Sequence, residues 1–297
     1  MKATFIYNPA AGPRGRGRGL NAREIERTAT AAGLDATLAQ TRDPGDACRL
    51  AEAAAHRGAD VIVAVGGDGT VHEVANGMLS SGSAGSALAA IPHGTGNDFA
   101  RLLGFRSSRS LLQSIRAIAQ GRQATFDVGR ALGRYFVNAI GVGFGPEVVS
   151  HVDGTGRGLT AYLLGITKAF WGYEAKELTV GWEGGFAQDR YFMVEVLNGR
   201  TVGGGFKAAP EADPQDGVLD IVSVGALRVW QIPVYVVAAI RGTHTSLSGV
   251  EIRSAKRVTI EAPSAVTVHM DGELYEAPEG KVEIEIMPAA LDVICAG

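Results

Sequence analysis

Residues 64–77 read AVGGDGTVHEVANG and come directly after apolar residues that are typical of a buried strand. Three glycines surround Asp68, and an Asp-Gly pair between apolar runs can form a β-hairpin. Beyond this pair, however, apolar residues recur with helical spacing, at Val71, Val74, Ala75 and Met78. The stretch therefore predicts a strand, a glycine turn and a helix.

The glycine turn around Asp68 has the features of an anion site. Free N–H groups at the start of a helix, together with the helix dipole, favour negative charge. Glycines lack a Cβ atom, so a phosphate can come within hydrogen-bonding distance of their backbone. Thr70 and Glu73 also have the spacing of a capping box, a structural role that is compatible with phosphate binding.

A second glycine turn, GTGND at residues 94–98, follows the next apolar run along the chain. Two such turns after successive parallel strands lie side by side at the carboxyl edge of the sheet, where ligands of open α/β sheets bind. The sequence contains no G-x-x-x-x-G-K-[ST] motif, and the turn does not have G-x-G-x-x-G spacing. These absences argue against a P-loop protein and against a dinucleotide-dependent dehydrogenase.

The pattern of the chain changes near Phe126. Before it, short apolar runs alternate with amphipathic ones, which predicts a three-layer α/β domain over residues 1–126. After it, a β-rich domain is expected over residues 127–287, with residues 288–297 completing the first domain. Strands are predicted at residues 134–143, 177–182, 190–199, 218–225, 250–262, 265–272 and 281–288. Asn, Asp and Gly punctuate these runs, as in an antiparallel β-sandwich, and helices are expected near residues 159–173 and 229–242.

Composition narrows the class of protein. The 297 residues carry a net charge of −3, which argues against a general nucleic-acid binder. Two cysteines, Cys48 and Cys295, form no metal motif and indicate a reducing compartment. The N-terminal apolar run is too short for a signal peptide, and residues 229–240 fall short of the roughly 20 residues that a spanning helix needs. We expect a cytoplasmic protein that can still visit a membrane surface.

Three motifs carry a family resemblance. NPAAG (8–12), GGDGT (66–70) and GTGND (94–98), in this order, resemble the diacylglycerol kinase catalytic domain family, whose lipid kinases include sphingosine kinases and bacterial homologues. NAD kinases and phosphofructokinases share GGDGT, whereas the pair of GGDGT and GTGNDFAR is more specific. The resemblance implies an ATP-binding α/β domain, a β-rich second domain and an active site in the cleft between them.

The resemblance also implies a set of nucleotide-binding residues. Besides Asp68, these are Asn8, Pro9, Ala10, Ala11, Gly12, Thr41, Gly66, Gly67, Gly69, Thr70, Val71, His72 and Thr95. Without the family context, Thr41 is explained by the β-propensity of a strand end and Thr95 by turn capping. His93 stands where leucine is common in the family, and it either alters substrate recognition or faces solvent.

A carboxylate-rich loop, APEADPQDGVLD at residues 209–220, resembles the Mg²⁺ loop of the family. The match places Asp213, Asp216 and the Val218 carbonyl at the metal, with Asp127 joined to it through water. Hard oxygen ligands of this kind suit Mg²⁺. Without the family, the same residues are explained by a turn at Asp216 and a strand cap at Asp127.

The resemblance places the catalytic base at Glu273, just after an Asp-Gly hairpin candidate in VHMDGELYEA (268–277). The alternative for Glu273 is a solvated turn residue. Asp68 is expected at the phosphate and magnesium end of the reaction, either as a metal ligand or as a group that orients the phosphates. Asp98 is a further candidate, with helix capping as its alternative.

Three arginines and two apolar stretches each have more than one explanation. Arg14, Arg16 and Arg18 could contact phosphates or anionic lipid headgroups, or form a solvated loop. The apolar stretches 159–173 and 229–240 either host an acyl chain or pack as buried helices on the sheet.

The resulting functional expectation is an ATP- and Mg²⁺-dependent lipid kinase that phosphorylates a hydroxyl of diacylglycerol or a sphingoid base. The alternatives are an NAD kinase-like phosphotransferase with a soluble acceptor and a nucleotide-binding regulator without catalysis. The expected partners are ATP and a lipid at a membrane surface, and not nucleic acid. The sequence leaves open whether the protein forms a homodimer.

Overall fold

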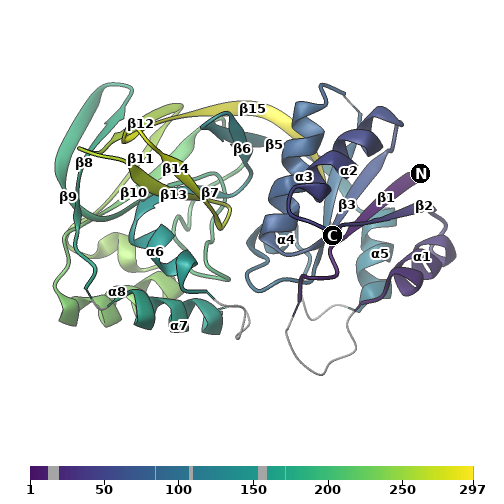
Figure 1. Ribbon diagram of the computed structural model, residues 1–297, viewed down its shortest axis with the longest axis horizontal. Coiled ribbons are helices and arrows are strands. Elements are labelled where there is room, and N and C mark those ends of the chain that lie inside the picture. The colour runs from purple at the N-terminus through teal and green to yellow at the C-terminus, as the bar shows by residue number, and fades with distance from the viewer. Residues whose placement is uncertain (13–19, 84, 107–109, 153–158, 171, 297) are drawn as a thin grey trace. The chain divides into compact units, whose positions relative to one another are not determined.

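The computed structural model describes residues 1–12, 20–83, 85–106, 110–152, 159–170 and 172–296. The chain divides into two compact units, Met1–Phe126 with Ala289–Gly297, and Asp127–Pro288 (Figure 1). It passes from the first unit to the second through β5 (Arg122–Ala131) and returns through β15 (Lys281–Cys295), and these two strands pair with one another.

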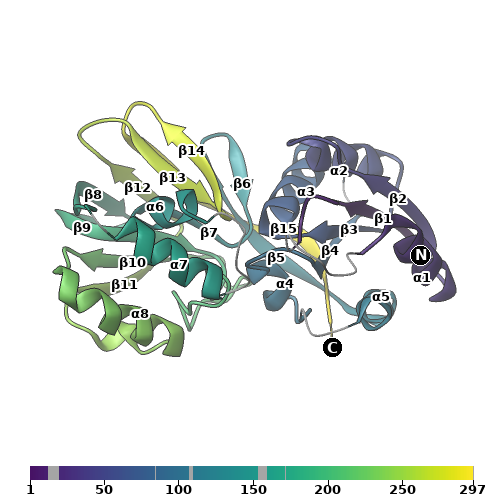
Figure 2. The same ribbon diagram turned by 60° about the horizontal axis from the view of Figure 1, so that its bottom comes forward.

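The first unit is a parallel sheet with helices on both faces, the three-layer α/β arrangement that the sequence predicts (Figure 2). Its own strands are β1 (Lys2–Tyr7), β2 (Asp35–Gln40), β3 (Val61–Gly66) and β4 (Ala87–Pro92). They lie in the order β2–β1–β3–β4, and the end of β15 adds beside β4 through Val293 and Leu88. The central strand β3 is buried along its whole length, as its continuous apolar sequence predicts.

The helices of the first unit form two groups. The group α1 with α5 packs together, as does the group α2 with α3. The bounds are α1 (Ala22–Ala31), α2 (Asp46–His56), α3 (Asp68–Ser80), α4 (Asp98–Leu102) and α5 (Leu111–Gln120). Helix α3 begins at the second residue after β3 ends, so the strand, turn and helix predicted around Asp68 are confirmed.

The second unit is a β-sandwich, and in the part of the chain that the structure describes the strands β6 to β14 pair with one another in antiparallel fashion. Its strands are β6 (Arg134–Phe136), β7 (Ala139–Gly143), β8 (Lys176–Trp182), β9 (Gly185–Leu197), β10 (Leu219–Gly225), β11 (Val250–Ala255), β12 (Arg257–Glu261), β13 (Val266–Met270) and β14 (Glu273–Ala277). The helical elements are α6 (Phe144–Ser150), α7 (Leu159–Ala169), η1 (Val229–Gln231), α8 (Ile232–Arg241) and η2 (His244–Ser246). The two helices that the sequence predicts in this part are α7 and α8.

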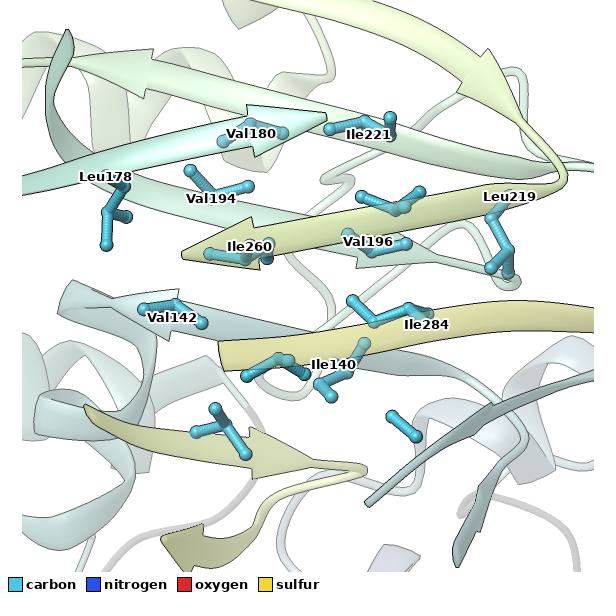
Figure 3. Close-up of a cluster of buried hydrophobic side chains, with 14 of the residues drawn as sticks. Ile140, Val142, Leu178, Val180, Val194, Val196, Leu219, Ile221, Ile260 and Ile284 are labelled. Atoms are coloured by element: carbon cyan, nitrogen blue, oxygen red, sulfur yellow. The ribbon is translucent and has the colours of Figure 1, made fainter. Parts of the chain in front are cut away.

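Alternation along the strands separates the two faces of the sandwich sheets. Val194 and Val196 of β9 point into the central core with residues such as Ile140, Ile221 and Ile260 (Figure 3). Glu195 and Leu197 alternate with these valines along the strand and therefore face the other side of β9. That second face carries the apolar cluster on which α6, α7 and α8 pack.

Two of the predicted strands are split. The run 134–143 forms β6 and β7 with a break at Val137 and Asn138, whose N–H groups donate to the Asp271 carboxylate instead of continuing a ladder. The run 250–262 divides at Lys256 into β11 and β12. Helix α6 was not expected, because its seven residues are too few to show a helical period.

Candidate functional site

The two glycine turns of the first unit touch through their backbones. Strands β3 and β4 run parallel with Gly66 opposite Pro92, and the His93 N–H donates to the Gly66 carbonyl at 2.8 Å. A Cβ atom on Gly94 would stand 2.2 Å from the Cα of Gly67, which no side chain allows. The predicted placement of two glycine surfaces side by side at the carboxyl edge of the sheet is therefore confirmed.

Asp68 lies against the second turn. It is the first residue of α3, and its Oδ1 accepts from the N–H of Phe99 at 3.3 Å. A Cβ atom on Gly96 would come within 2.4 Å of Asp68 Oδ2, so glycine at this position leaves room for the carboxylate. The half-buried Asp68 therefore links the two turns, because its backbone belongs to the first turn and its carboxylate contacts the second.

The NPAAG loop joins this arrangement through Asn8. The Asn8 N–H donates to the Val65 carbonyl at 3.0 Å, and its Nδ2 donates to Thr70 Oγ1 at 3.1 Å. Its Oδ1 accepts from the N–H groups of Ala10 and Ala11 at 2.9 and 3.2 Å, which folds the loop back on itself. The loop therefore sits beside the first glycine turn.

The far end of the NPAAG loop meets the second turn at His93. A Cβ atom on Gly12, whose φ is +110°, would be 2.8 Å from His93 Nε2. The imidazole therefore lies against Gly12, so of the two explanations for the departure at this position, contact with the candidate site fits better than a solvent-facing side chain. Arg14, Arg16 and Arg18 come next along the chain and lie outside the described residues.

The other proposed nucleotide-binding residues differ in exposure. Thr41 is buried at the end of β2, where its N–H donates to the Tyr7 carbonyl at 2.9 Å. The side chains of Val71 and His72 are buried within α3, so a ligand at the turn could meet only their backbone. Pro9 and Ala10 are exposed, and Thr95 is half-buried in the second turn.

The capping box expected at Thr70 and Glu73 is not formed. Gly67 is the N-cap of α3 and no side chain caps it, while Thr70 Oγ1 accepts from Asn8. The Glu73 carboxylate instead accepts from the N–H groups of Gly45 and Ala47, both at 3.0 Å, at the start of α2. Spacing within one helix could not show this, because the N-terminus of α2 also offers unpaired N–H groups and a favourable dipole.

Asn97 braces the second turn rather than capping α4 through its side chain. It has left-handed backbone angles, and its amide group accepts from the Gly94 N–H and donates to the Gly94 carbonyl, at 2.9 and 2.8 Å. Asp98 is buried and pairs with Arg101, which also donates to the Gly96 carbonyl at 3.1 Å. Arg101 was missed as a site residue, although its place three residues after Asp98 predicts a contact on one helix face.

The carboxylate-rich loop of the second unit folds around Asp127. The buried Asp127 donates its N–H to the Pro214 carbonyl and accepts from the Gly217 N–H, both at 2.7 Å. Asp213 and Asp216 are exposed and accept from backbone N–H groups two residues ahead. The turn that the sequence offered as an alternative is thus present.

These loop oxygens are chemically suited to Mg²⁺, because they are hard ligands on a compact turn. Among the described residues, however, no three His, Cys, Asp or Glu side chains gather closely enough to hold a metal ion. A magnesium ion at Asp213 and Asp216 would therefore also need the Val218 carbonyl and water as ligands.

Glu273 follows a two-residue hairpin turn between β13 and β14, as the Asp-Gly pair predicts. Met270 pairs with Glu273, and both central residues have positive φ, 51° at Asp271 and 90° at Gly272. The Asp271 carboxylate is buried and accepts from the N–H groups of Val137, Asn138 and Ala139 at 2.9 to 3.1 Å. The exposed Glu273 is therefore held on a turn that is fixed to the start of β7.

A buried acid–histidine pair lies under the same hairpin and was not expected from the sequence. His269 Nε2 lies 3.0 and 2.9 Å from the two Glu195 oxygens, and both side chains are buried. Cβ atoms on Gly141 and Gly145 would come within 2.3 and 2.4 Å of the Glu195 carboxylate, so these glycines make the room for it. The only sequence signal was a polar residue inside each of two apolar strands.

The pair has a defined effect on the charge of His269. Burial by itself lowers the pKa of His269, but the charge and hydrogen bond of Glu195 together with the charge of Asp271 outweigh burial and leave the pKa raised. A raised folded-state pKa stabilises the fold below the unfolded-state pKa of about 6.5. That contribution is lost as the pH rises through the folded-state pKa.

We expect Glu195→Gln to lower the free energy of unfolding more at about pH 5.5 than at about pH 9. The neutral amide removes the charge that keeps buried His269 protonated, so the penalty is largest where the wild type holds the proton. Denaturant unfolding of both proteins across this range measures the difference, and the exposed Glu177→Gln serves as control. A difference that stays constant with pH would show that His269 is neutral throughout.

No helix in the described part of the chain is long and apolar enough to cross a membrane.

Comparison with known proteins covers both units. Residues 2–131 match the diacylglycerol kinase catalytic domain, and residues 138–295 match the YegS C-terminal NAD kinase beta sandwich-like domain. A diacylglycerol kinase of Bacillus subtilis (strain 168) is 30% identical over 283 residues, which cover 92% of this chain and 89% of the relative. A diacylglycerol kinase of Staphylococcus aureus (strain MRSA252) is 28% identical over 275 residues, covering 92% and 86%.

Solved structures agree with the sequence matches. A crystal structure of a diacylglycerol kinase from Bacillus anthracis str. Sterne superposes with a TM-score of 0.73 at 25% identity, covering 99% of this chain and 96% of the other. A second crystal structure from that organism gives a TM-score of 0.80 at 26% identity over 99% and 97% of the two chains. The chain therefore belongs to the diacylglycerol kinase catalytic domain family.

Proposed function

We propose that this protein is an ATP- and Mg²⁺-dependent lipid kinase that transfers the γ-phosphoryl group to a hydroxyl of diacylglycerol or a related lipid such as a sphingoid base. The observation that carries the proposal is the backbone contact between the two glycine turns, with the Asp68 carboxylate held against both. Bare backbone at the start of a helix is suited to phosphates, and a carboxylate beside it is suited to their metal ion or their orientation. Family membership supports the same reaction.

In this proposal the nucleotide lies along the NPAAG loop and the first glycine turn, with Thr41 and Thr95 as further contacts. Asn8 has the central place among these residues, since it bonds both the loop and Thr70. The backbone N–H groups of the turn would bind the phosphates without a side chain between them. Asp68 would act at the phosphate end.

Glu273 is the proposed catalytic base. The lipid hydroxyl oxygen forms a bond to the γ-phosphorus while the bond from that phosphorus to the ADP oxygen breaks, and the hydroxyl proton passes to the Glu273 carboxylate. The Asp271 anchor supports this role, because a base must be held at a fixed position to meet a reacting hydroxyl.

The loop of Asp213, Asp216 and the Val218 carbonyl, with Asp127 behind it, is the proposed Mg²⁺ site of the second unit. A metal ion there would offset negative charge and stiffen the loop. The protein is further proposed to act from the cytoplasm on lipids at a membrane surface.

The reaction is tested with radiolabelled ATP, Mg²⁺ and two acceptor classes, lipids in mixed micelles and NAD in solution. We expect label in a lipid phosphate and none in a phosphorylated dinucleotide. Label in NADP would favour the NAD kinase-like alternative. ATP binding without transfer to any lipid of a broad extract would favour a nucleotide-binding regulator.

Glu273→Gln is expected to lower the rate of lipid phosphorylation by about 10²- to 10⁴-fold, because the amide cannot take up the hydroxyl proton. ATP binding, measured by calorimetry, stays unchanged. Glu279→Gln, an exposed glutamate six residues further on, is the matched control and keeps its activity. Normal turnover by Glu273→Gln would show that Glu273 is not the catalytic base.

Asp68→Asn separates a chemical role of Asp68 from a structural one. The asparagine keeps an oxygen that can accept from the Phe99 N–H, and it has nearly the same volume. If the charge acts on phosphate or metal, Asp68→Asn and Asp68→Ala both lose at least about a hundredfold in rate while remaining folded. Full activity of Asp68→Asn would mean that Asp68 only braces the second turn.

A further inference from the structure

The buried pair of Glu195 and His269 spans three strands of the second unit. His269 of β13 lies opposite Gly141 of β7, and Gly141 lies opposite Glu195 of β9. Residues directly opposite one another in antiparallel strands carry their side chains on the same face of the sheet. The two side chains therefore meet over Gly141, whose missing side chain leaves the space that the Glu195 carboxylate fills.

Helix α6 covers the pair. It begins at Phe144, directly after β7. A Cβ atom on Gly145, in its first turn, would lie 2.4 Å from Glu195 Oε1 and 3.1 Å from the His269 ring. Glycine inside a strand or a helix has no side chain to pack and loses more conformational entropy on folding than other residues. Two glycines, one on β7 and one on α6, thus leave room for one carboxylate.

Stability alone is a weak reason for this pair. Glu195 is 1% exposed and His269 6% exposed, so both groups have lost the water that would solvate their charges. An apolar pair of similar volume is often as stable or more stable in such a place. In addition, His269 Nδ1 has no hydrogen-bond partner among the described residues, which makes its burial less favourable. These unfavourable contributions indicate a role for the pair beyond stability.

The pair lies at the base of the hairpin formed by β13 and β14. His269 is the next-to-last residue of β13, and Glu273 is the first residue of β14. Between them, the buried Asp271 accepts from three backbone N–H groups at the break between β6 and β7, and its own N–H donates to the Ala139 carbonyl at 2.9 Å. The end of β13 is thus held twice, at the turn by Asp271 and under α6 by His269.

Glu273 lies on the opposite face of the hairpin from His269. It pairs with Met270, which points into the central core, whereas His269 pairs with Leu274 and faces α6. Any effect of the pair on Glu273 therefore passes through the hairpin backbone. Such an effect need not be large in distance, because a displacement of about 1 Å in a reacting group can lower a rate by about a hundredfold.

We propose that the buried pair of Glu195 and His269 positions Glu273, by tying the end of β13 to β9 and so holding the hairpin where its carboxylate can accept the proton of the lipid hydroxyl. This role deepens the proposed lipid kinase function and rests on it. Glu195 and His269 are positioning residues, because they are buried and act through the backbone of the hairpin. Their hydrogen bonds are directional, and this fixes one position of the hairpin.

The pair makes the hairpin sensitive to pH. Burial lowers the pKa of His269, while the charge and hydrogen bond of Glu195 and the charge of Asp271 raise it by more. The pair is therefore ionic below the folded-state pKa of His269 and loses its charge attraction as the pH rises through that pKa. The other titratable side chains on β9 and on the elements packed against β13 are Glu147 of α6, with His151 at its end, Asp189, Arg190 and Tyr191 of β9, and Glu273, Tyr275 and Glu276 of β14.

The first test compares kcat for lipid phosphorylation by wild type and Glu195→Gln between about pH 5 and pH 10, at saturating ATP and lipid. We expect the wild-type kcat to fall at alkaline pH as His269 loses its proton. In Glu195→Gln the fall begins at lower pH, because the amide does not hold this proton. At about pH 7, kcat should be about tenfold lower, while the KM for ATP stays within about twofold of wild type.

Thr267→Val is the matched control for this profile. Thr267 lies on β13 two residues before His269, and its hydroxyl donates to the exposed Glu276 on β14 at 2.7 Å. The substitution removes a polar contact from the same hairpin and leaves the buried pair in place. Its kcat and its pH profile should match those of wild type.

A second variant separates positioning from stability. Glu195→Met/His269→Leu replaces the ion pair by apolar side chains of similar volume, so the free energy of unfolding should be equal to that of wild type or higher. Apolar contact is not directional and does not fix the hairpin in one position. We therefore expect kcat at about pH 7 to be at least about tenfold lower, with no alkaline fall due to His269. If this variant does not fold, the pH profile of Glu195→Gln decides the proposal.

Amide hydrogen exchange reads the hairpin without the reaction. Exchange of residues 266–277, followed by mass spectrometry at about pH 7, should be about tenfold or more faster in Glu195→Gln than in wild type, and unchanged in Thr267→Val. If wild type phosphorylates no lipid, the proposed function fails, while the exchange result still decides whether the pair holds the hairpin.

Three outcomes would overturn the positioning role. The first is a Glu195→Gln variant with the wild-type pH profile and the wild-type exchange of residues 266–277. The second is a folded Glu195→Met/His269→Leu variant with the wild-type kcat. The third is a loss of kcat in Glu195→Gln that equals the unfolded fraction at every pH, because the pair would then serve stability alone.

Discussion

The contact between the backbones of Gly67 and Gly94 is the constraint on which the candidate site depends. Two parallel strands, β3 and β4, end at the same edge, and each feeds a turn that leads into a helix. The turns approach so closely that a Cβ atom on Gly94 would stand 2.2 Å from the Cα of Gly67, and one on Gly67 would stand 3.0 Å from the Cα of Gly94. The glycines therefore serve the packing of the turns as well as the approach of a phosphate. Asp68 and Asn8 take their positions from this contact, since both bind groups on the turns.

In the second unit, the exposed carboxylate of Glu273 lies on a hairpin whose backbone is held in place by Asp271. A hairpin tip is ordinarily the least constrained part of a sheet. Here the Asp271 carboxylate is buried and accepts hydrogen bonds from three N–H groups at the break between β6 and β7, those of Val137, Asn138 and Ala139. One buried carboxylate thereby provides hydrogen-bond acceptors for the N–H groups at the break and holds the turn that precedes Glu273. His269, on the strand that leads into the hairpin, bonds Glu195 through Nε2, so a second buried polar contact supports the hairpin.

Sequence patterns were most informative where the determining interactions are local. The apolar run of β3 and the helical spacing after Thr70 identified the strand, turn and helix around Asp68 correctly. The Asp-Gly pair at 271–272 identified its hairpin for the same reason, because both residues adopt the positive φ that this turn requires. Patterns failed where a partner comes from elsewhere in the chain. Glu73 has capping-box spacing within α3, yet it caps α2, and residues 134–143 alternate as one strand, yet Asp271 divides them.

The sequence by itself determined the fold class of both units, the two glycine turns and the order of the motifs, because strand and helix periods and glycine positions are properties of short segments. The tertiary structure alone decided which polar groups meet. It brought Glu195 of β9 to His269 of β13 across the intervening strand β7, set Arg101 against the second turn and left one face of α8 apolar and exposed. The identity of an apolar residue on a helix does not tell whether its side chain faces a core or solvent. Only the packing of that helix on its sheet distinguishes the two.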